Sequence, residues 1–168
     1  MPQQRLTARK HPKRCKRKNP QKLLRRRKGA VLRDPSGESD YLPHKYNNNC
    51  VVYTGTHDND TVNGWISSLG RKDLAFAKKY LNVRRTSDLC ETLIRTALGS
   101  VADTAVIPMQ DYLGLGGEAR INMPSTLGGN WEWRMENGAC TEKLSQHMLE
   151  LAQIYGRTGH ANEGKKKK

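Results

Sequence analysis

The sequence predicts an α/β fold in which the strands are parallel. Two short apolar runs, residues 50–53 and 104–107, have the composition of buried strands and end at Gly55 and Pro108. Helical patterns separate and follow these runs, and the order strand, helices, strand, helix indicates parallel strands with helical crossovers. Because two parallel strands that are buried on both faces need neighbours, we expect the body to be part of a larger sheet.

The helices are predicted from the spacing of apolar residues. Residues 61–69 and 72–80 have the pattern of two short helices, a third helix begins near residues 87–88, and a last helix covers residues 141–155. A long Gly-rich loop over residues 114–129 follows the second strand. The apolar stripe of the third helix consists of Leu89, Leu93, Ile94, Ala97, Leu98 and Val101, and that of the last helix of Leu144, Met148, Leu151 and Tyr155.

Charge divides the chain into a body and two basic appendages. Residues 1–33 contain 14 Lys and Arg and no Asp or Glu, residues 34–164 contain 12 basic and 16 acidic residues, and the last four residues are Lys. The leading segment has no aromatic residue and few aliphatic ones, so it has too little apolar surface to fold. We expect a disordered basic arm over residues 1–35, a folded body over 36–158 and a disordered Lys-rich tail over 159–168.

The charge of the arm is compatible with binding to nucleic acid, because each Lys or Arg that neutralises a phosphate releases a counterion. No stacking aromatic residue, zinc-ligand spacing or recognition helix accompanies this charge. The expected binding is therefore salt-sensitive and non-specific, and a selected nucleic-acid role is the weaker alternative.

The rest of the composition favours a cytoplasmic protein. No apolar run approaches the ~18 residues of a membrane span, and the arm has no Ser before Ser36, whereas transit peptides are Ser-rich. Cys15, Cys50, Cys90 and Cys140 are scattered without a C-x-x-C pair. Neither a zinc site nor a redox motif is indicated, and buried free thiols are expected.

A polar run, HDND at residues 57–60, follows the first strand after the short segment Thr54-Gly55-Thr56. In α/β proteins the carboxyl ends of strands are where side chains meet ligands, so this run is a candidate site. It is not an EF-hand loop, which would need Gly and Glu where this chain has Asn63 and Leu69. The alternative is a turn in which Asp58 and Asp60 only cap the following helix.

The Gly-rich loop contains two further patterns. GLGGEA at residues 114–119 fits the loose dinucleotide fingerprint G-x-G-x-x-A, but residues 108–113 separate it from the strand, so no nucleotide cofactor is indicated. Further along, the loop combines amides with Trp131 and Trp133, and aromatic faces beside amides suit sugar rings. A place in the core explains the two Trp residues equally well.

Several uncommon motifs occur in one order along the body. They are YLPH at residues 41–44, TGTHDNDTVNGW at 54–65, PMQDYLGL at 108–115, EARIN at 118–122 and WEWR at 131–134. Together they resemble the C-terminal portion of 4-alpha-glucanotransferases, the amylomaltase or disproportionating-enzyme family, over about residues 36–155. The resemblance implies a (β/α)8 TIM barrel of which this chain holds the seventh and eighth strands. It also implies transfer of α-1,4-glucan segments between maltodextrins, without a cofactor or a metal.

The resemblance also implies roles for three residues. Asp58 matches an aspartate that stabilises the positive charge of the transition state, His57 matches a residue that hydrogen-bonds the sugar, and Asn122 matches an Asn that contacts substrate. In the family the nucleophile and the acid/base lie upstream on the fourth and fifth strands, where this sequence has the acid-free arm. We therefore expect the chain alone to be inactive.

Three functions follow from these observations: a truncated glucan transferase, a basic nucleic-acid-binding protein that uses residues 1–33, and a glucan-binding remnant without catalysis. One origin would explain the arm. KGAVLR at residues 28–33 can be encoded by DNA that gives RVLFFA one base later, which is close to the family's strand before Tyr41. We hypothesise that the arm is upstream coding sequence translated out of frame.

Overall fold

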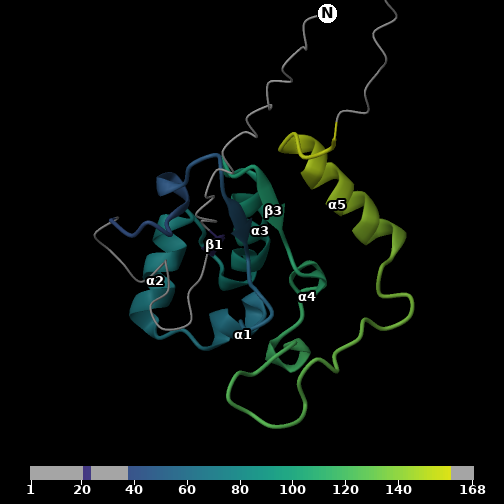
Figure 1. Cartoon of the computed structure of the whole chain (residues 1–168). Coiled ribbons are helices and arrows are strands. Elements are labelled where there is room, and N and C mark those ends of the chain that lie inside the picture. The colour runs from purple at the N-terminus through teal and green to yellow at the C-terminus, as the bar shows by residue number, and fades with distance from the viewer. Residues whose placement is uncertain (1–20, 24–37, 160–168) are drawn as a thin grey trace, which may run out of the picture.

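The computed structural model describes residues 21–23 and 38–159, and its centre is a small parallel sheet (Figure 1). The strands are β1 (Gln21–Leu23), β2 (Val51–Tyr53) and β3 (Thr104–Val106), in the order β1-β2-β3. Val52 pairs with Lys22 on one side and with Ala105 on the other. The two predicted strands and their parallel orientation are confirmed.

The strand β1 corrects one expectation, because residues 21–23 lie inside the arm that was expected to be disordered. The prediction considered only side chains, whereas a strand ladder forms between backbone N–H and C=O groups, which the edge of β2 offers to any sequence. The other residues of the predicted arm, and residues 160–168 of the predicted tail, lie outside the described part of the chain.

Five α-helices and three short 3₁₀ turns complete the described residues. The 3₁₀ turns are Pro43–Lys45, Thr86–Asp88 and Gly117–Ala119, and the helices are α1 (Val62–Ser67), α2 (Arg71–Tyr80), α3 (Leu89–Leu98), α4 (Met109–Tyr112) and α5 (Glu142–Ile154). Thr61 and Thr141 cap α1 and α5, because each hydroxyl accepts a hydrogen bond from a backbone N–H three residues on. The four predicted helices are confirmed, whereas α4 was not predicted, since one turn after a proline shows no periodicity.

The core lies between the sheet and α3. The predicted stripe of α3 is buried from Leu89 to Leu98, and it packs with Val52 of β2 and with Leu151 of α5, both fully buried. Burial of each such side chain contributes about 1.5–3 kcal/mol. Val101 was predicted to belong to the stripe, but it is 54% exposed because α3 ends at Leu98.

The second strand also differs from its prediction. Residues 104–107 were expected to be buried on both faces, but Thr104 and Val106 of β3 are exposed and only Ala105 between them is partly buried. On the face of the sheet that carries Thr104 and Val106, their neighbours Val51 and Tyr53 in β2 are partly buried.

The cysteines follow their prediction in part. Cys50 and Cys90 are free and buried, Cys140 is free but exposed, and Cys15 lies outside the described residues. Of the helices that the structure describes, none has the length and apolar character needed to span a membrane.

Candidate functional site

The polar run that follows β2 begins with a buried anchor. Thr54 is 1% exposed, and its Oγ1 donates a hydrogen bond to Oδ2 of Asp111 over 2.6 Å. Oδ1 of Asp111 accepts a hydrogen bond from the backbone N–H of Val62, at the start of α1, over 2.7 Å. Asp111 on α4 therefore holds both ends of the loop that connects β2 to α1.

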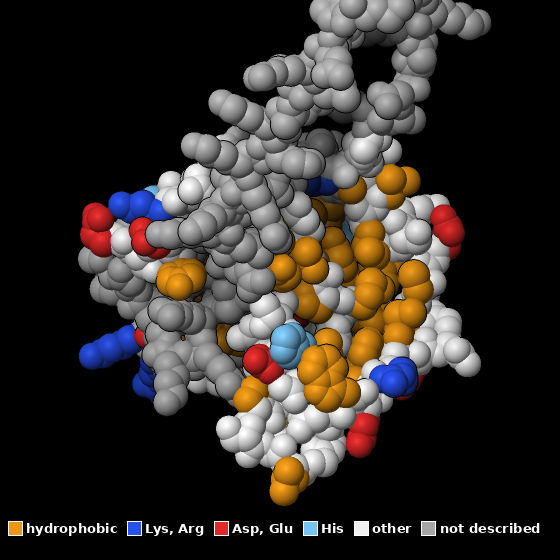
Figure 2. Space-filling model, in the orientation of Figure 1, with side chains coloured by type: hydrophobic (Ala, Val, Ile, Leu, Met, Phe, Trp, Pro, Cys, Tyr) orange, Lys and Arg blue, Asp and Glu red, His pale blue; other side chains and the backbone are white. Residues whose placement is uncertain are grey.

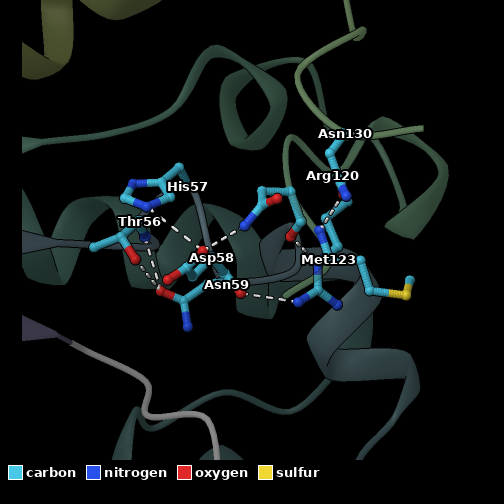
Figure 3. Close-up of polar contacts among 8 residues, drawn as sticks. Thr56, His57, Asp58, Asn59, Arg120, Met123 and Asn130 are labelled. Carbon is cyan, nitrogen blue, oxygen red and sulfur yellow. Dashed lines mark hydrogen bonds and ion pairs between the residues drawn. The ribbon is translucent and has the colours of Figure 1, made fainter. Parts of the chain in front are cut away.

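Inside this loop, Asn59 forms a tight turn with Thr56 (Figure 3). Oδ1 of Asn59 accepts hydrogen bonds from the N–H and the hydroxyl of Thr56, at 2.9 and 2.7 Å, and the N–H of Asn59 donates back to the carbonyl of Thr56. Such side-chain-to-backbone bonds fix a turn without regular secondary structure. The turn presents His57 and Asp58 at the carboxyl end of β2.

Asp58 is accessible and lies beside His57. Nε2 of His57 is 3.5 Å from Oδ1 of Asp58, and the two side chains are 54% and 44% exposed. Asp58 does not cap α1, because the N-cap is Thr61, and Asp60 accepts a hydrogen bond from the N–H of Thr61 instead. The alternative in which both aspartates serve only as helix caps is therefore wrong for Asp58.

The loop after α4 reaches the same place, and its Asn122 lies 64 positions further along the chain than Asp58. Nδ2 of Asn122 donates a hydrogen bond to Oδ1 of Asp58 over 2.6 Å, so the structure brings the three predicted site residues together. Arg120 fixes this pair through its guanidinium, which donates to the backbone carbonyls of Asp58 and Asn122, both at 2.8 Å (Figure 3).

The sequence did not indicate Arg120, because an arginine that donates to two backbone carbonyls leaves no side-chain partner in the sequence to reveal it. The only signal was its place two residues before Asn122 in a loop that contains a candidate site residue.

Trp131 lies on the same side as His57, with the two ring centres 5.1 Å apart and the rings tilted by 34°. The indole is 56% exposed, so the alternative that Trp131 belongs to the core is wrong. Its backbone has φ of +67°, which is unfavourable for a bulky side chain, and its N–H donates to the carbonyl of Ile121 over 2.7 Å. Trp133 is partly buried.

Two glycines, one in α1 and one in the 3₁₀ turn Gly117–Ala119, allow the backbone to pack closely against the side chain of Asp60. A Cβ at Gly64 of α1 would overlap with the carboxylate of Asp60, and one at Gly117 would lie 3.1 Å from its Oδ1. A cavity of about 20 Å³ beside this contact is lined by Asp60, Asp111 and Arg120, among others, and has room for about one water. The Asp58 carboxylate lies outside this cavity, on the surface.

The part of the chain that the structure describes contains no cluster of potential metal ligands. Within residues 21–23 and 38–159, no three His, Cys, Asp or Glu side chains are grouped so that they could hold an ion. The site therefore consists of one accessible carboxylate, an imidazole, an amide and an exposed indole.

These residues lie within a match to a known family model. The model is described as 4-alpha-glucanotransferase, and residues 28–141 match it, which includes both site loops. This chain belongs to the 4-alpha-glucanotransferase family. The resemblance inferred from the motifs is thereby confirmed.

Individual members of the family are similar over most of this chain. The 4-alpha-glucanotransferase of Clostridium butyricum is 48% identical over 118 residues, which are 70% of this chain and 24% of that protein. The chloroplastic/amyloplastic 4-alpha-glucanotransferase of Arabidopsis thaliana is 43% identical over 134 residues, covering 76% of this chain and 23% of that one. This chain thus spans about a quarter of the length of these relatives.

A solved structure is similar over a comparable share of this chain. The amylomaltase of Streptococcus agalactiae, in complex with acarbose, superimposes with a TM-score of 0.70 at 39% identity, over 74% of this chain and 25% of that one. The α/β part of the predicted fold is confirmed by this match.

Proposed function

We propose that residues 36–158 form the last part of the (β/α)8 barrel of a retaining 4-alpha-glucanotransferase, in which Asp58 stabilises the transition state. The observation that carries this proposal is the Asp58 carboxylate, which is accessible at the carboxyl end of a parallel strand and fixed by Asn122 at 2.6 Å. Family membership over residues 28–141 supports it. The substrates would be α-1,4-glucans or maltodextrins, and no cofactor is required.

The chemistry asks for a fixed anion at this position. In retaining transfer, positive charge develops at the anomeric carbon in the transition state, and a carboxylate placed beforehand stabilises that state more than the ground state. Asn122 donates to Oδ1, while Oδ2 accepts no hydrogen bond from the described residues and is available to face the sugar. His57 and Asn122 then hydrogen-bond hydroxyls of the same ring.

The bond-making groups are proposed to lie outside residues 36–158. Retaining transfer needs one carboxylate as nucleophile and one as acid/base, about 5–5.5 Å apart. Relatives are about three times as long as this chain, which leaves room for both elsewhere in the fold. We therefore expect that the 168-residue chain alone does not disproportionate maltotriose, and a purified sample that does would contradict this.

Binding tests the role of Asp58 without turnover. Acarbose carries an amine that takes up a proton, whereas maltotetraose is neutral, so a stabilising carboxylate should favour acarbose. By calorimetry on the chain, Asp58→Asn should weaken acarbose binding about tenfold and maltotetraose binding much less, where tenfold corresponds to about 1.4 kcal/mol. Asp103→Asn is the control, since Asp103 is exposed next to the opposite end of β3. An unchanged affinity ratio in Asp58→Asn would refute the role.

A second candidate function rests on the 14 Lys and Arg of residues 1–33, which lie largely outside the described residues. It predicts binding to heparin that weakens steeply with salt, together with no retention on immobilised maltodextrin. Glucan retention that disappears in Asp58→Asn would favour the first function. A cytoplasmic location stays a prediction.

A further inference from the structure

The basic residues of the folded body are concentrated in one segment. Residues 71–88 contain six of the 12 Lys and Arg that lie between residues 34 and 164, but only two of the 16 Asp and Glu. Six basic and two acidic residues give this segment a formal charge of +4, whereas six basic and 14 acidic residues give the rest of the body −8. A local excess of one sign attracts partners of the opposite sign. The six cations are Arg71, Lys72, Lys78, Lys79, Arg84 and Arg85.

Four of these cations lie side by side on one face of α2. With about 100° between successive residues, their order around the helix is Lys78, Arg71, Lys79 and Lys72. The remaining residue of this sector is Ala75, which is exposed and small, so it does not hold a partner away from the cations. Arg71, Lys72 and Lys79 are exposed as well, and Lys78 is partly buried. This sector is called the basic face below.

Two further cations follow where α2 ends. Asn82 has φ of +54°, the left-handed conformation that ends many helices, so the chain turns away from the helix axis at this point. Arg84 and Arg85 come shortly after this turn and are exposed. Arg85 forms an ion pair with Asp88 over 3.0 Å. Arg84 and the three exposed cations of the basic face form no ion pair with another described residue.

The opposite side of α2 belongs to the core. Ala77 is fully buried, and Leu74, Phe76 and Tyr80 pack against the core. The helix therefore has no free apolar side to bury in lipid, as a helix in a membrane interface does. Figure 1 places α2 on the side of the molecule away from α5, and Figure 2, in the same orientation, shows Lys and Arg side chains projecting on that side. A partner of this surface must be held by charge.

We propose that the basic face and Arg84 bind the phosphate backbone of double-stranded nucleic acid, independently of base sequence. The ten residues of α2 extend over about 15 Å. A duplex presents one negative charge per about 1.7 Å of its axis, so each cation has phosphates within reach. The basic face contains no aromatic side chain on which unpaired bases would stack, which favours a duplex over a single strand. This surface belongs to the folded body, so its binding is separate from that of residues 1–33 and from any reaction at Asp58.

The test measures how binding to a duplex depends on salt. A fluorescently labelled duplex of about 20 base pairs and mixed sequence is titrated with the 168-residue chain, and the association constant is measured by anisotropy between about 50 and 200 mM NaCl. Each phosphate contact contributes about 0.9 to the slope of the logarithm of this constant against the logarithm of salt concentration. The triple variant Arg71→Gln, Lys72→Gln, Lys79→Gln should therefore lower the magnitude of that slope by about 2.7.

A matched pair of single substitutions provides the control. Lys79→Gln should lower the magnitude of the slope by about 0.9, whereas Lys143→Gln, which removes one exposed charge from α5, should leave it unchanged. Circular dichroism checks that each variant keeps its helices. If the triple variant does not, the double variant Lys72→Gln, Lys79→Gln replaces it, with an expected decrease of about 1.8.

Four results would overturn the inference. Equal slopes for the unsubstituted chain and the triple variant would mean that other cations, such as those of residues 1–33, make the contacts. Absence of binding at about 50 mM NaCl would exclude the surface as a site for nucleic acid, and tighter binding to a single strand of the same sequence would exclude a base-paired partner. Retention on vesicles of phosphatidylcholine and phosphatidylserine, at a ratio of about three to one, that disappears in the triple variant and occurs without binding to the duplex would assign the basic face to a membrane.

Discussion

Asp111 is the side chain on which the geometry of the site loop depends most. It is 2% exposed and accepts two hydrogen bonds, from the Thr54 hydroxyl at 2.6 Å and from the Val62 N–H at 2.7 Å. A hydrogen bond to a charged group contributes about 1.5–3 kcal/mol, so Asp111→Ala should lower the free energy of unfolding by about 3–6 kcal/mol. Small domains are stable by only about 5–15 kcal/mol, so this one substitution removes a large share of the total.

Asp111→Asn is the matched variant, because its Oδ1 can still accept from Val62 while its Nδ2 can donate to the Thr54 hydroxyl. We expect it to cost about 1–2 kcal/mol. Thr54→Val, which removes one donor and keeps the shape, should cost a similar amount. The measurement is urea unfolding, followed by circular dichroism and by tryptophan fluorescence.

A double-mutant cycle checks the reasoning. If Thr54 stabilises the fold through Asp111, then Thr54→Val should cost almost nothing in the background of Asp111→Ala. Costs that simply add, or an Asp111→Ala variant within 1 kcal/mol of the unsubstituted chain, would refute the idea that this carboxylate holds the loop.

Three further predictions concern Arg120 at the site, the close contact at Gly64, and Tyr46 in the core. Arg120→Ala should weaken acarbose binding about tenfold, because the carbonyls of Asp58 and Asn122 lose the donor that they share. Arg120→Lys should restore only part of the affinity, because an ammonium group lacks the planar fork of donors. Equal affinity of the unsubstituted chain and both variants would contradict a positioning role for Arg120. Gly64→Ala should destabilise the chain by about 1–3 kcal/mol because its Cβ overlaps with Asp60, whereas a Cβ at Gly70 meets nothing within 4 Å, so Gly70→Ala should change urea stability far less. Burial, followed by the nearby Cys50 and Tyr80, raises the pKa of Tyr46 above its ordinary value of 10.0. The folded state therefore favours the neutral phenol, and the stability that it gives is complete below pH 10 and is lost as the pH rises above it. Urea stability should fall less steeply above pH 10 in Tyr46→Phe, and parallel curves would contradict this.

The sequence predicted those parts of the fold that depend on the spacing of side chains. The buried positions of α3 repeat with the helical period, and β2 and β3 are short apolar runs that end before Gly55 and Pro108, so these elements could be found without a structure. The strand β1 could not be found in this way, because its pairing with β2 involves only backbone groups and its surrounding sequence is dominated by charge. The exposure of Val106 was missed because an apolar strand has the same sequence whether its face is covered or open.

The site was predictable to a different degree. Asp58 and His57 come shortly after a strand, and the carboxyl ends of parallel strands are where ligands bind, so general rules identified them. Asn122 became a candidate only through the family motifs, since it lies in an irregular loop 64 positions from its partner. The roles of Asp111 and Arg120 were missed, because Asp111 bonds a hydroxyl and a backbone N–H far from it in the sequence, and Arg120 bonds two backbone carbonyls.

The two loops of the site meet because β2 and β3 are adjacent and parallel, so the segments that follow them leave the same edge of the sheet. Asp111 links the first of these segments to α4, and Arg120 links it to the second, so each contact depends on β3 keeping its register with β2. The 2.6 Å contact between Asn122 and Asp58 therefore depends on the sheet as well as on the two loops, and it fixes the carboxylate before any ligand binds.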